Sequence, residues 1–156
     1  MGIIRVYADT SVFGGIFDEE FKMPTRKFFD QVKSGGFALV TSAIVQDEIA
    51  LAPTEVRNFF DELLRFCDVA DVSKHALELR DAYLHSRILP SKYSDDALHV
   101  AVATVSGCSL IVSWNFKHIV HFQKIPLYNA INAIQGYPQI AIFSPLEVIR
   151  FEDEEV

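Results

Sequence analysis

Four widely separated segments place oxygen-bearing side chains after predicted strands or at the start of a predicted helix. Asp9 directly follows the first apolar strand, Glu48 lies one or two helical turns past the second, Asp95 and Asp96 open an apolar helix, and Asn115 follows a later strand. Clustered carboxylates repel one another and are stabilised by a cation. Hard divalent cations such as Mg²⁺ and Mn²⁺ take oxygen ligands, activate water and neutralise phosphodiester transition states. The residue types therefore favour a metal site suited to phosphodiester hydrolysis.

Each residue also has a simpler interpretation. Asp9 or Asn115 alone is compatible with capping of the turn that follows it. Glu48 alone is compatible with a solvated helix face. Asp95 and Asp96 together suit a helix N-terminus, where negative charge is favourable, although that accounts for only one of the two. It is the combination of four segments, each ending at the same edge of one sheet, that favours the metal site.

The elements that must position these residues are short apolar runs alternating with amphipathic or buried segments. Continuous apolar strands that alternate with helices predict an α/β protein with a parallel sheet covered on both faces. Ligands of such sheets bind beyond the carboxyl ends of the strands. Ser42, Ser73 and Ser94 are expected to cap helices, and 12–21 is either a short helix or an irregular turn. The predicted strands are 3–8, 37–41, 68–72, 109–113 and 140–143, and the predicted helices are 25–33, 42–51, 53–64, 73–86, 95–106 and 127–135.

Composition limits the class of protein. The chain has 156 residues, 50% of them hydrophobic, and a net charge of −7, which excludes a disordered chain and an extended basic arm for coating nucleic acid. We expect one domain over 1–150 and an acidic tail over 151–156. Cys67 and Cys108 have neither disulfide-framework nor zinc spacing and are expected to be reduced thiols. With no signal peptide or membrane span in the sequence, a cytoplasmic location is expected.

Five segments of the sequence, in order, resemble the PIN domain family. They include the strand–Asp–Thr/Ser start and the Asp-Ala-x-x-x-Ala-x-Ala helix of that family. No single segment is specific, but all five at sensible spacing form a strong signal. The segments are Tyr7–Phe13, Thr41–Ile49, Ser94–Ala103, Ser113–Phe116 and Ile142–Glu147.

The resemblance implies a three-layer α/β/α sandwich with a central parallel sheet of about five strands, and a metal-dependent ribonuclease. It assigns Asp9, Glu48 and Asp96 as catalytic, metal-binding acids for Mg²⁺ or Mn²⁺. Asp96 is preferred to Asp95 because the alanine of the family's helix must follow it in register. Asn115 stands where many relatives have Asp, so it is expected as a neutral fourth member whose carbonyl oxygen can still act as a ligand.

The resemblance also bears on partners. Small stand-alone PIN domains resemble the VapC-like toxins of bacterial toxin–antitoxin pairs, which implies a homodimer and an antitoxin protein. The run Trp114 to His118 indicates a sub-branch of the family with retained function. The alternative is a catalytically weakened PIN domain that binds RNA or a protein, and Asn115 is its main support. A phosphotransferase with Asp9 as nucleophile is disfavoured because no second acid stands two residues further on.

Several neighbours are expected to assist the acids. Thr10 and Ser11 are expected to bond nearby backbone or to orient a metal-bound water. His99, one helical turn past Asp96, is either a core histidine with a satisfied ring or a partner of the acids. Lys117 is either a phosphate contact or an ordinary surface lysine.

Overall fold

A five-stranded parallel sheet forms the centre of the molecule, with strand order β3-β2-β1-β4-β5. The computed structural model describes residues 2–150. It confirms the predicted sheet, and all neighbouring strands pair in parallel. The acidic tail predicted for 151–156 lies outside the described residues. The strands are β1 (Arg5–Ala8), β2 (Ala38–Ser42), β3 (Cys67–Ala70), β4 (Leu110–Val112) and β5 (Ala141–Phe143).

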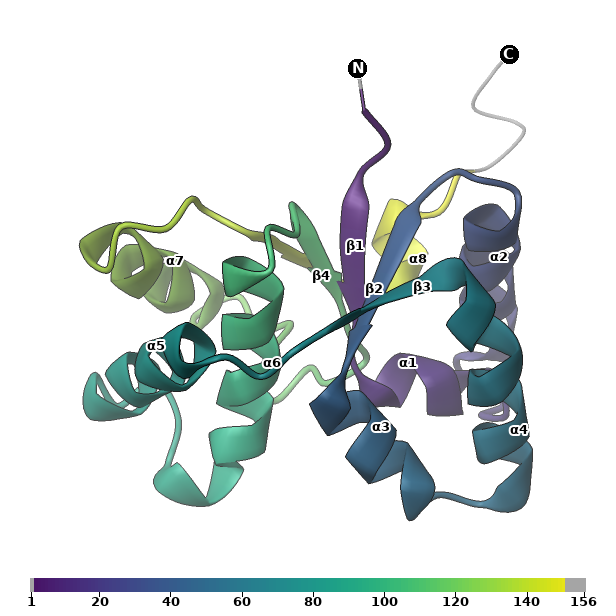
Figure 1. The fold of residues 1–156 in the computed structure, drawn as a ribbon, viewed down its shortest axis with the longest axis horizontal. Helices are drawn as coiled ribbons and strands as arrows, with labels where there is room; N and C mark the ends of the chain where they lie inside the picture. Colours follow the sequence, from purple (N-terminus) through teal and green to yellow (C-terminus); the bar gives the residue numbers. More distant parts are fainter. Residues whose placement is uncertain (1, 151–156) are drawn as a thin grey trace.

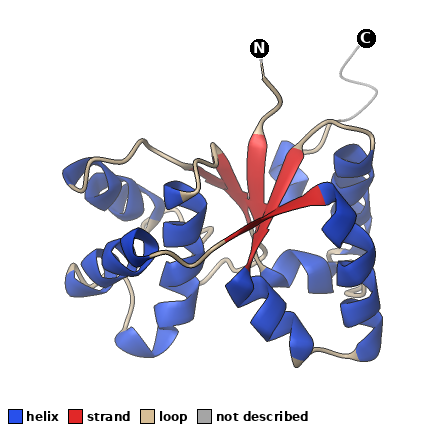
Figure 2. Ribbon diagram, in the orientation of Figure 1, coloured by secondary structure: helices blue, strands red, loops and turns tan. Residues whose placement is uncertain are grey.

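Helices cover both faces of the sheet and complete the three-layer α/β/α arrangement (Figures 1 and 2). One layer contains α5, α6 and α7, and the other contains α1, α2 and α4. No helix in residues 2–150 is long and apolar enough to cross a membrane. The helices are α1 (Thr10–Gly15), α2 (Lys22–Lys33), α3 (Ala43–Ala50), α4 (Thr54–Leu63), α5 (Lys74–His85), α6 (Ser94–Val105), α7 (Ile125–Ile134) and α8 (Pro145–Val148), with the 3₁₀ turns η1 (Leu64–Phe66) and η2 (Ser91–Tyr93).

The helix starts test the capping predictions. The side chains of Ser42 and Ser73 accept hydrogen bonds from the third backbone N–H that follows, as predicted. The prediction for Ser94 is wrong: η2 runs directly into α6, so Ser94 already has helical dihedral angles and the cap position passes to Tyr93. Helices α2 and α7 begin three and two residues earlier than predicted, because a proline is tolerated in a first helical turn.

Helix α6 is the rigid support of the candidate site. Its eight consecutive residues from Ala97 to Thr104 are all buried, as expected for a helix that is apolar on nearly every side. It packs against α5 and follows η2 at the carboxyl edge of the sheet. The helix that carries Asp96 and His99 is therefore fixed within the core of the protein.

Candidate active site

Asp9 lies at the carboxyl end of β1 and is buried, with 4% of its surface exposed. Its Oδ1 accepts a hydrogen bond from Ser11 Oγ at 2.6 Å, and its Oδ2 accepts one from Ser113 Oγ at 2.7 Å. Asp9 stands at the N-cap of α1, but its side chain makes no capping hydrogen bond. The capping interpretation of Asp9 is thus wrong, and the carboxylate is directed to the serine hydroxyls instead.

Burial raises the pKa of Asp9 above its ordinary value. The negative charge of Asp96 adds to that rise, whereas His99 and the two serine hydroxyls oppose it. Because burial outweighs the hydroxyl donors, the ionised form of Asp9 is under-stabilised by the protein alone. A cation is the partner that would compensate it.

Glu48 extends from α3 towards the same edge and is about one-third exposed. Its Oε1 accepts a hydrogen bond from Thr10 Oγ1 at 2.5 Å and lies 2.7 Å from His99 Nε2. Burial alone would raise the pKa of Glu48, but the hydrogen bond and charge of His99, together with the Thr10 hydroxyl, lower it below its ordinary value. Glu48 is therefore ionised at neutral pH.

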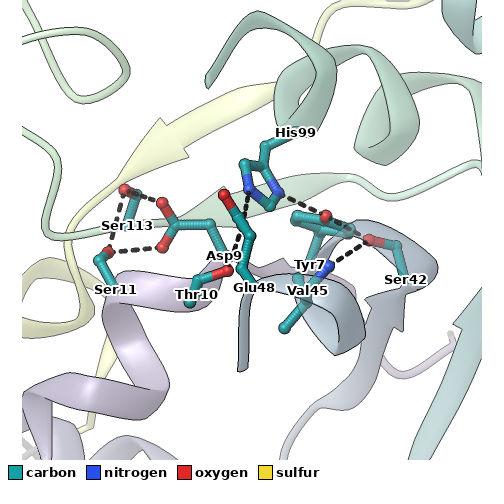
Figure 3. A network of polar contacts seen from close by, with 9 residues as sticks. All are labelled: Tyr7, Asp9, Thr10, Ser11, Ser42, Val45, Glu48, His99 and Ser113. Atoms are coloured by element: carbon teal, nitrogen blue, oxygen red, sulfur yellow. Dashed lines mark hydrogen bonds and ion pairs between the residues drawn. The ribbon is translucent and has the colours of Figure 1, made fainter. Parts of the chain in front are cut away.

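His99 connects Glu48 to the interior of the protein (Figure 3). Its Nδ1 lies 2.7 Å from the hydroxyl of Tyr7, which lies 2.8 Å from Ser42 Oγ. Burial lowers the pKa of His99, but the hydrogen bond to Glu48 and the charges of the acids raise it more, so it lies above its ordinary value. His99 meets both interpretations: it is a buried histidine with a partner at each ring nitrogen, and one of those partners is an acid.

Tyr7 and Ser42 were not identified as part of the site from the sequence. The available signal was a tyrosine within an otherwise apolar strand, because a buried phenol needs a hydrogen-bond partner. Ser42 also caps α3, so the series of hydrogen bonds Ser42–Tyr7–His99 fixes the start of that helix. Through His99 the same series fixes Glu48, the acid that the helix carries.

Asp96 and Asn115 meet through His118. Nδ1 of His118 lies 2.8 Å from Asp96 Oδ2, and its backbone N–H donates to Asn115 Oδ1 at 2.9 Å. The side chain of Asn115 thus caps the turn that follows it, one of the two roles open to it from the sequence. Asp95 is exposed and lines, with Glu48, a separate pocket of about 510 Å³ between α3 and α6. The contact between His118 and Asp96 has no signal in the sequence.

Trp114 anchors the loop that carries these residues. Its backbone N–H donates to Ser11 Oγ at 2.9 Å, and its indole N–H donates to Thr25 Oγ1 at 2.9 Å. The indole stacks on Phe21, with ring centroids 4.1 Å apart. Gly15 makes room for it, because a Cβ at that position would lie 2.8 Å from the indole nitrogen. The first residue of the Trp-Asn-Phe-Lys-His run therefore fixes the loop against α1 and α2.

The donor set suits a hydrated divalent cation. Burial and repulsion from Asp96 both disfavour the ionised form of Asp9, and all the acids offer oxygen ligands. Within residues 2–150, no group of three or more His, Cys, Asp or Glu side chains is arranged to hold a metal ion. Mg²⁺ commonly binds through one or two carboxylates and retains several waters. The oxygen donors are therefore of the kind that such an ion takes, and Asp9 and Asp96 are the residues that would hold it.

Comparison with known proteins places these residues in a family. A model of the PIN domain matches residues 6–118. The chain belongs to the PIN domain family. The matched segment carries Asp9 at the end of β1, Glu48 on α3 and Asp96 at the start of α6, while Asn115 follows β4. No curated protein matches the sequence at a significant level.

Solved structures with low sequence identity share the fold. VapBC from Salmonella typhimurium, solved bound to DNA, is 15% identical, has a TM-score of 0.58, and the match covers 92% of this chain and 99% of that one. FitAcB from Neisseria gonorrhoeae is 12% identical, with a TM-score of 0.58 and coverage of 92% and 99%. VapBC2 from Rickettsia felis, bound to a promoter DNA fragment, is 12% identical, with a TM-score of 0.56 and coverage of 89% and 97%. These likenesses support the α/β fold.

Proposed function

We propose that this PIN domain is a ribonuclease that hydrolyses RNA phosphodiesters with Mg²⁺ or Mn²⁺. The observation that carries the proposal is the buried Asp9, whose carboxylate accepts hydrogen bonds from two neutral hydroxyls and whose pKa is raised by burial and Asp96 despite the opposing charge of His99. When bound, the ion would supply Lewis-acid stabilisation of the scissile phosphate and lower the pKa of water. Asp9, Glu48 and Asp96 are the catalytic and metal-binding residues of this proposal.

The residues of the chain would divide the work. Asp9 and Asp96 would hold the ion, and Ser11 and Ser113 would orient the two oxygens of Asp9. Glu48, kept ionised by His99, is suited to accept a proton from the attacking water at Oε1 or Oε2. One lone pair of Asn115 Oδ1 accepts the hydrogen bond from the His118 N–H. If Asn115 also binds the ion, it would do so through the second lone pair of Oδ1.

The test is an RNA cleavage assay with the full chain. Purified protein and Mn²⁺ should cleave a labelled single-stranded or structured RNA, and cleavage should be lost in EDTA and in Asp9→Asn. Glu20→Gln, at an exposed acid outside the site, is the matched control and should cleave as the wild type does. Equal behaviour of wild type and Asp9→Asn would contradict the proposal.

A second candidate function is a binding module without catalysis, and two observations favour it. Asn115 replaces an acid with a side chain that caps a turn, and no group of three metal-ligating side chains is found within residues 2–150. Calorimetric titration separates the candidates: an enzyme should bind Mn²⁺ at or below millimolar concentration, whereas a binding module should show no heat of binding.

We further propose that the protein is the toxin of a toxin–antitoxin pair, which its likeness to VapBC and FitAcB favours, and that it acts in the cytoplasm. Under this proposal the chain forms a homodimer and is inhibited by an antitoxin. Size-exclusion chromatography with light scattering tests the dimer, and relief of growth arrest by a neighbouring reading frame tests the antitoxin.

A further inference from the structure

A basic pocket lies next to the acids, between η2 and the turn that follows β4. It has a volume of about 470 Å³. The described residues that line it include five basic side chains, one aromatic ring and no acid. They are Pro90, Lys92, Tyr93, Lys117, His118, His121 and Lys124.

The concentration of positive charge in this pocket is unusual for the chain. The protein has seven lysines and a net charge of −7, yet three of those lysines line this one pocket. Unpaired like charges gathered in a concave site repel one another, and an anion relieves that repulsion. The pocket therefore has the charge of an anion-binding site within an acidic protein.

The lysines are arranged around a fixed aromatic ring. The ammonium groups of Lys92 and Lys117 lie 5.1 and 5.9 Å from the centroid of the Tyr93 ring, within cation–π range. The same ring packs on His118, with centroids 3.9 Å apart. Lys124 donates to the carbonyl of Ile88 at 3.0 Å. Two of the three ammonium groups thus gather at one ring, and the third borders the same pocket.

His118 joins this pocket to the candidate active site. Its ring forms part of the pocket lining and its Nδ1 lies 2.8 Å from Asp96 Oδ2. The Tyr128 hydroxyl donates to the His118 carbonyl at 2.8 Å, which fixes the position of this residue further. A ligand in the pocket is therefore one side chain away from the proposed cation site.

We propose that Lys92, Lys117 and Lys124 bind a backbone phosphate of RNA adjacent to the phosphate that is cleaved. This inference rests on the proposed ribonuclease function and names the subsite that seats its substrate. Lysine ammonium groups bind phosphate as compact point charges. Asp9 and Asp96 lie next to the basic pocket at Lys117, and this arrangement matches two consecutive phosphates of one RNA strand. A cation would bridge the reacting phosphate to the acids, and the lysines would bind the adjacent phosphate directly.

Fluorescence anisotropy of a labelled ten-nucleotide single-stranded RNA tests the inference, with the full chain in EDTA at several KCl concentrations. Lys92 and Lys117 are exposed, so Lys92→Gln/Lys117→Gln should fold normally. It should bind RNA at least about tenfold more weakly, and the slope of log affinity against log salt should fall by about 0.7, the value for one phosphate contact on a single strand. In Mn²⁺ the same variant should raise KM with little change in kcat.

The matched control is Lys33→Gln/Lys74→Gln, which makes the same change of charge at two lysines that do not line the pocket. It should change affinity less than twofold. Equal loss in both variants, or cleavage by the wild type with an unchanged KM in the pocket variant, would overturn the inference and leave the ribonuclease proposal intact. If the pocket variant binds RNA as the wild type does but no longer binds an aspartate-rich peptide, the pocket binds a protein partner and the inference is overturned. If the wild type neither binds nor cleaves RNA, both proposals fail.

Discussion

Asp9 and Glu48 lie at the same edge of the sheet, but the protein treats their carboxylates in opposite ways. Asp9 is buried and accepts hydrogen bonds from the neutral hydroxyls of Ser11 and Ser113, and its pKa is raised. Glu48 is partly exposed and is paired with His99, and its pKa is lowered. The charge of His99 favours both carboxylates, but only Glu48 contacts its ring directly, and burial still leaves the pKa of Asp9 raised.

This difference indicates which acid needs an added cation. A buried carboxylate with only neutral donors is costly to ionise, so Asp9 gains most from a metal ion. Glu48 gains less, because a metal would have to share the carboxylate with His99. The two acids are therefore separable by experiment, even though one ion would bring them into the same reaction.

Replacing Asp9 should have the largest effect on activity and a small or opposite effect on stability. In Asp9→Asn, Mn²⁺-dependent RNA cleavage should fall at least about 100-fold, because the principal metal ligand loses its charge. The neutral amide removes a buried charge, so the melting temperature without metal should hold or rise at neutral pH. A fall in melting temperature as large as that of Glu48→Gln would erase the contrast between the acids.

Replacing Glu48 should instead destabilise the fold. In Glu48→Gln the buried His99 loses its ionic acceptor, which should lower the free energy of unfolding by about 1–2 kcal/mol in a urea titration. Asp47→Asn, at an exposed position on the same helix, is the matched control and should change the free energy of unfolding by less than about 0.5 kcal/mol. If the two variants unfold at the same urea concentration, the pair with His99 contributes nothing.

The pair of His99 and Glu48 should give a characteristic pH dependence. Because folding raises the pKa of His99, the stability that His99 contributes is fully present below its pKa in the unfolded chain, which is about 6.5. That contribution is lost as pH rises through the pKa of His99 in the folded protein. Because folding lowers the pKa of Glu48, the stability that Glu48 contributes is lost as pH falls through the pKa of Glu48 in the folded protein.

The difference in melting temperature between wild type and His99→Gln should therefore peak in mildly acidic solution and shrink on both sides. His75→Gln, at an exposed histidine, supplies the control profile. A difference that stays constant from pH 4 to pH 9 would mean that His99 contributes packing alone.

The smallest effect is expected from the hydroxyls around Asp9. Ser113→Ala removes one of its two donors, which should raise the pKa of Asp9 further and move the acidic limb of the activity profile to higher pH. A hydrogen bond worth about 1 kcal/mol corresponds to a shift of less than one pH unit. Ser109→Ala, at an exposed position before the same strand, should leave the profile in place.

The fold and the placement of the acids could be read from local patterns. Apolar runs of four to six residues predicted four of the strands, and a mixed segment with two Asp predicted β3. The parallel arrangement then required their carboxyl ends to share one edge. The helical register of Ala97 separated Asp96, which contacts His118, from Asp95, which is exposed. Boundaries were less predictable: the sequence contains no sign that η2 continues into α6 and removes Ser94 from the cap position.

The partners of the acids could not be predicted, because they come from distant parts of the chain. Tyr7 and His99 are 92 residues apart, and Asp96 and His118 are joined across a strand and a turn. A single sequence gives residue types at each position but not which side chains meet across the sheet. The assignment of Asp9, Glu48, Asp96 and Asn115 as metal ligands stays a prediction for the experiments above.

The central position of β1 in the sheet determines when the candidate site can assemble during synthesis of the chain. Strand β1 pairs with β2 early in the chain, but its other neighbour, β4, begins at Leu110, and the Ser113 donor to Asp9 is 104 residues away. Contacts of such long separation form slowly, and domains fold from the N-terminus as they emerge. A nascent chain that ends before β4 holds Asp9, Glu48 and Asp96 but lacks Ser113, so it cannot complete the surroundings of Asp9. The order of folding thus delays assembly of the candidate site until nearly three-quarters of the polypeptide has been made.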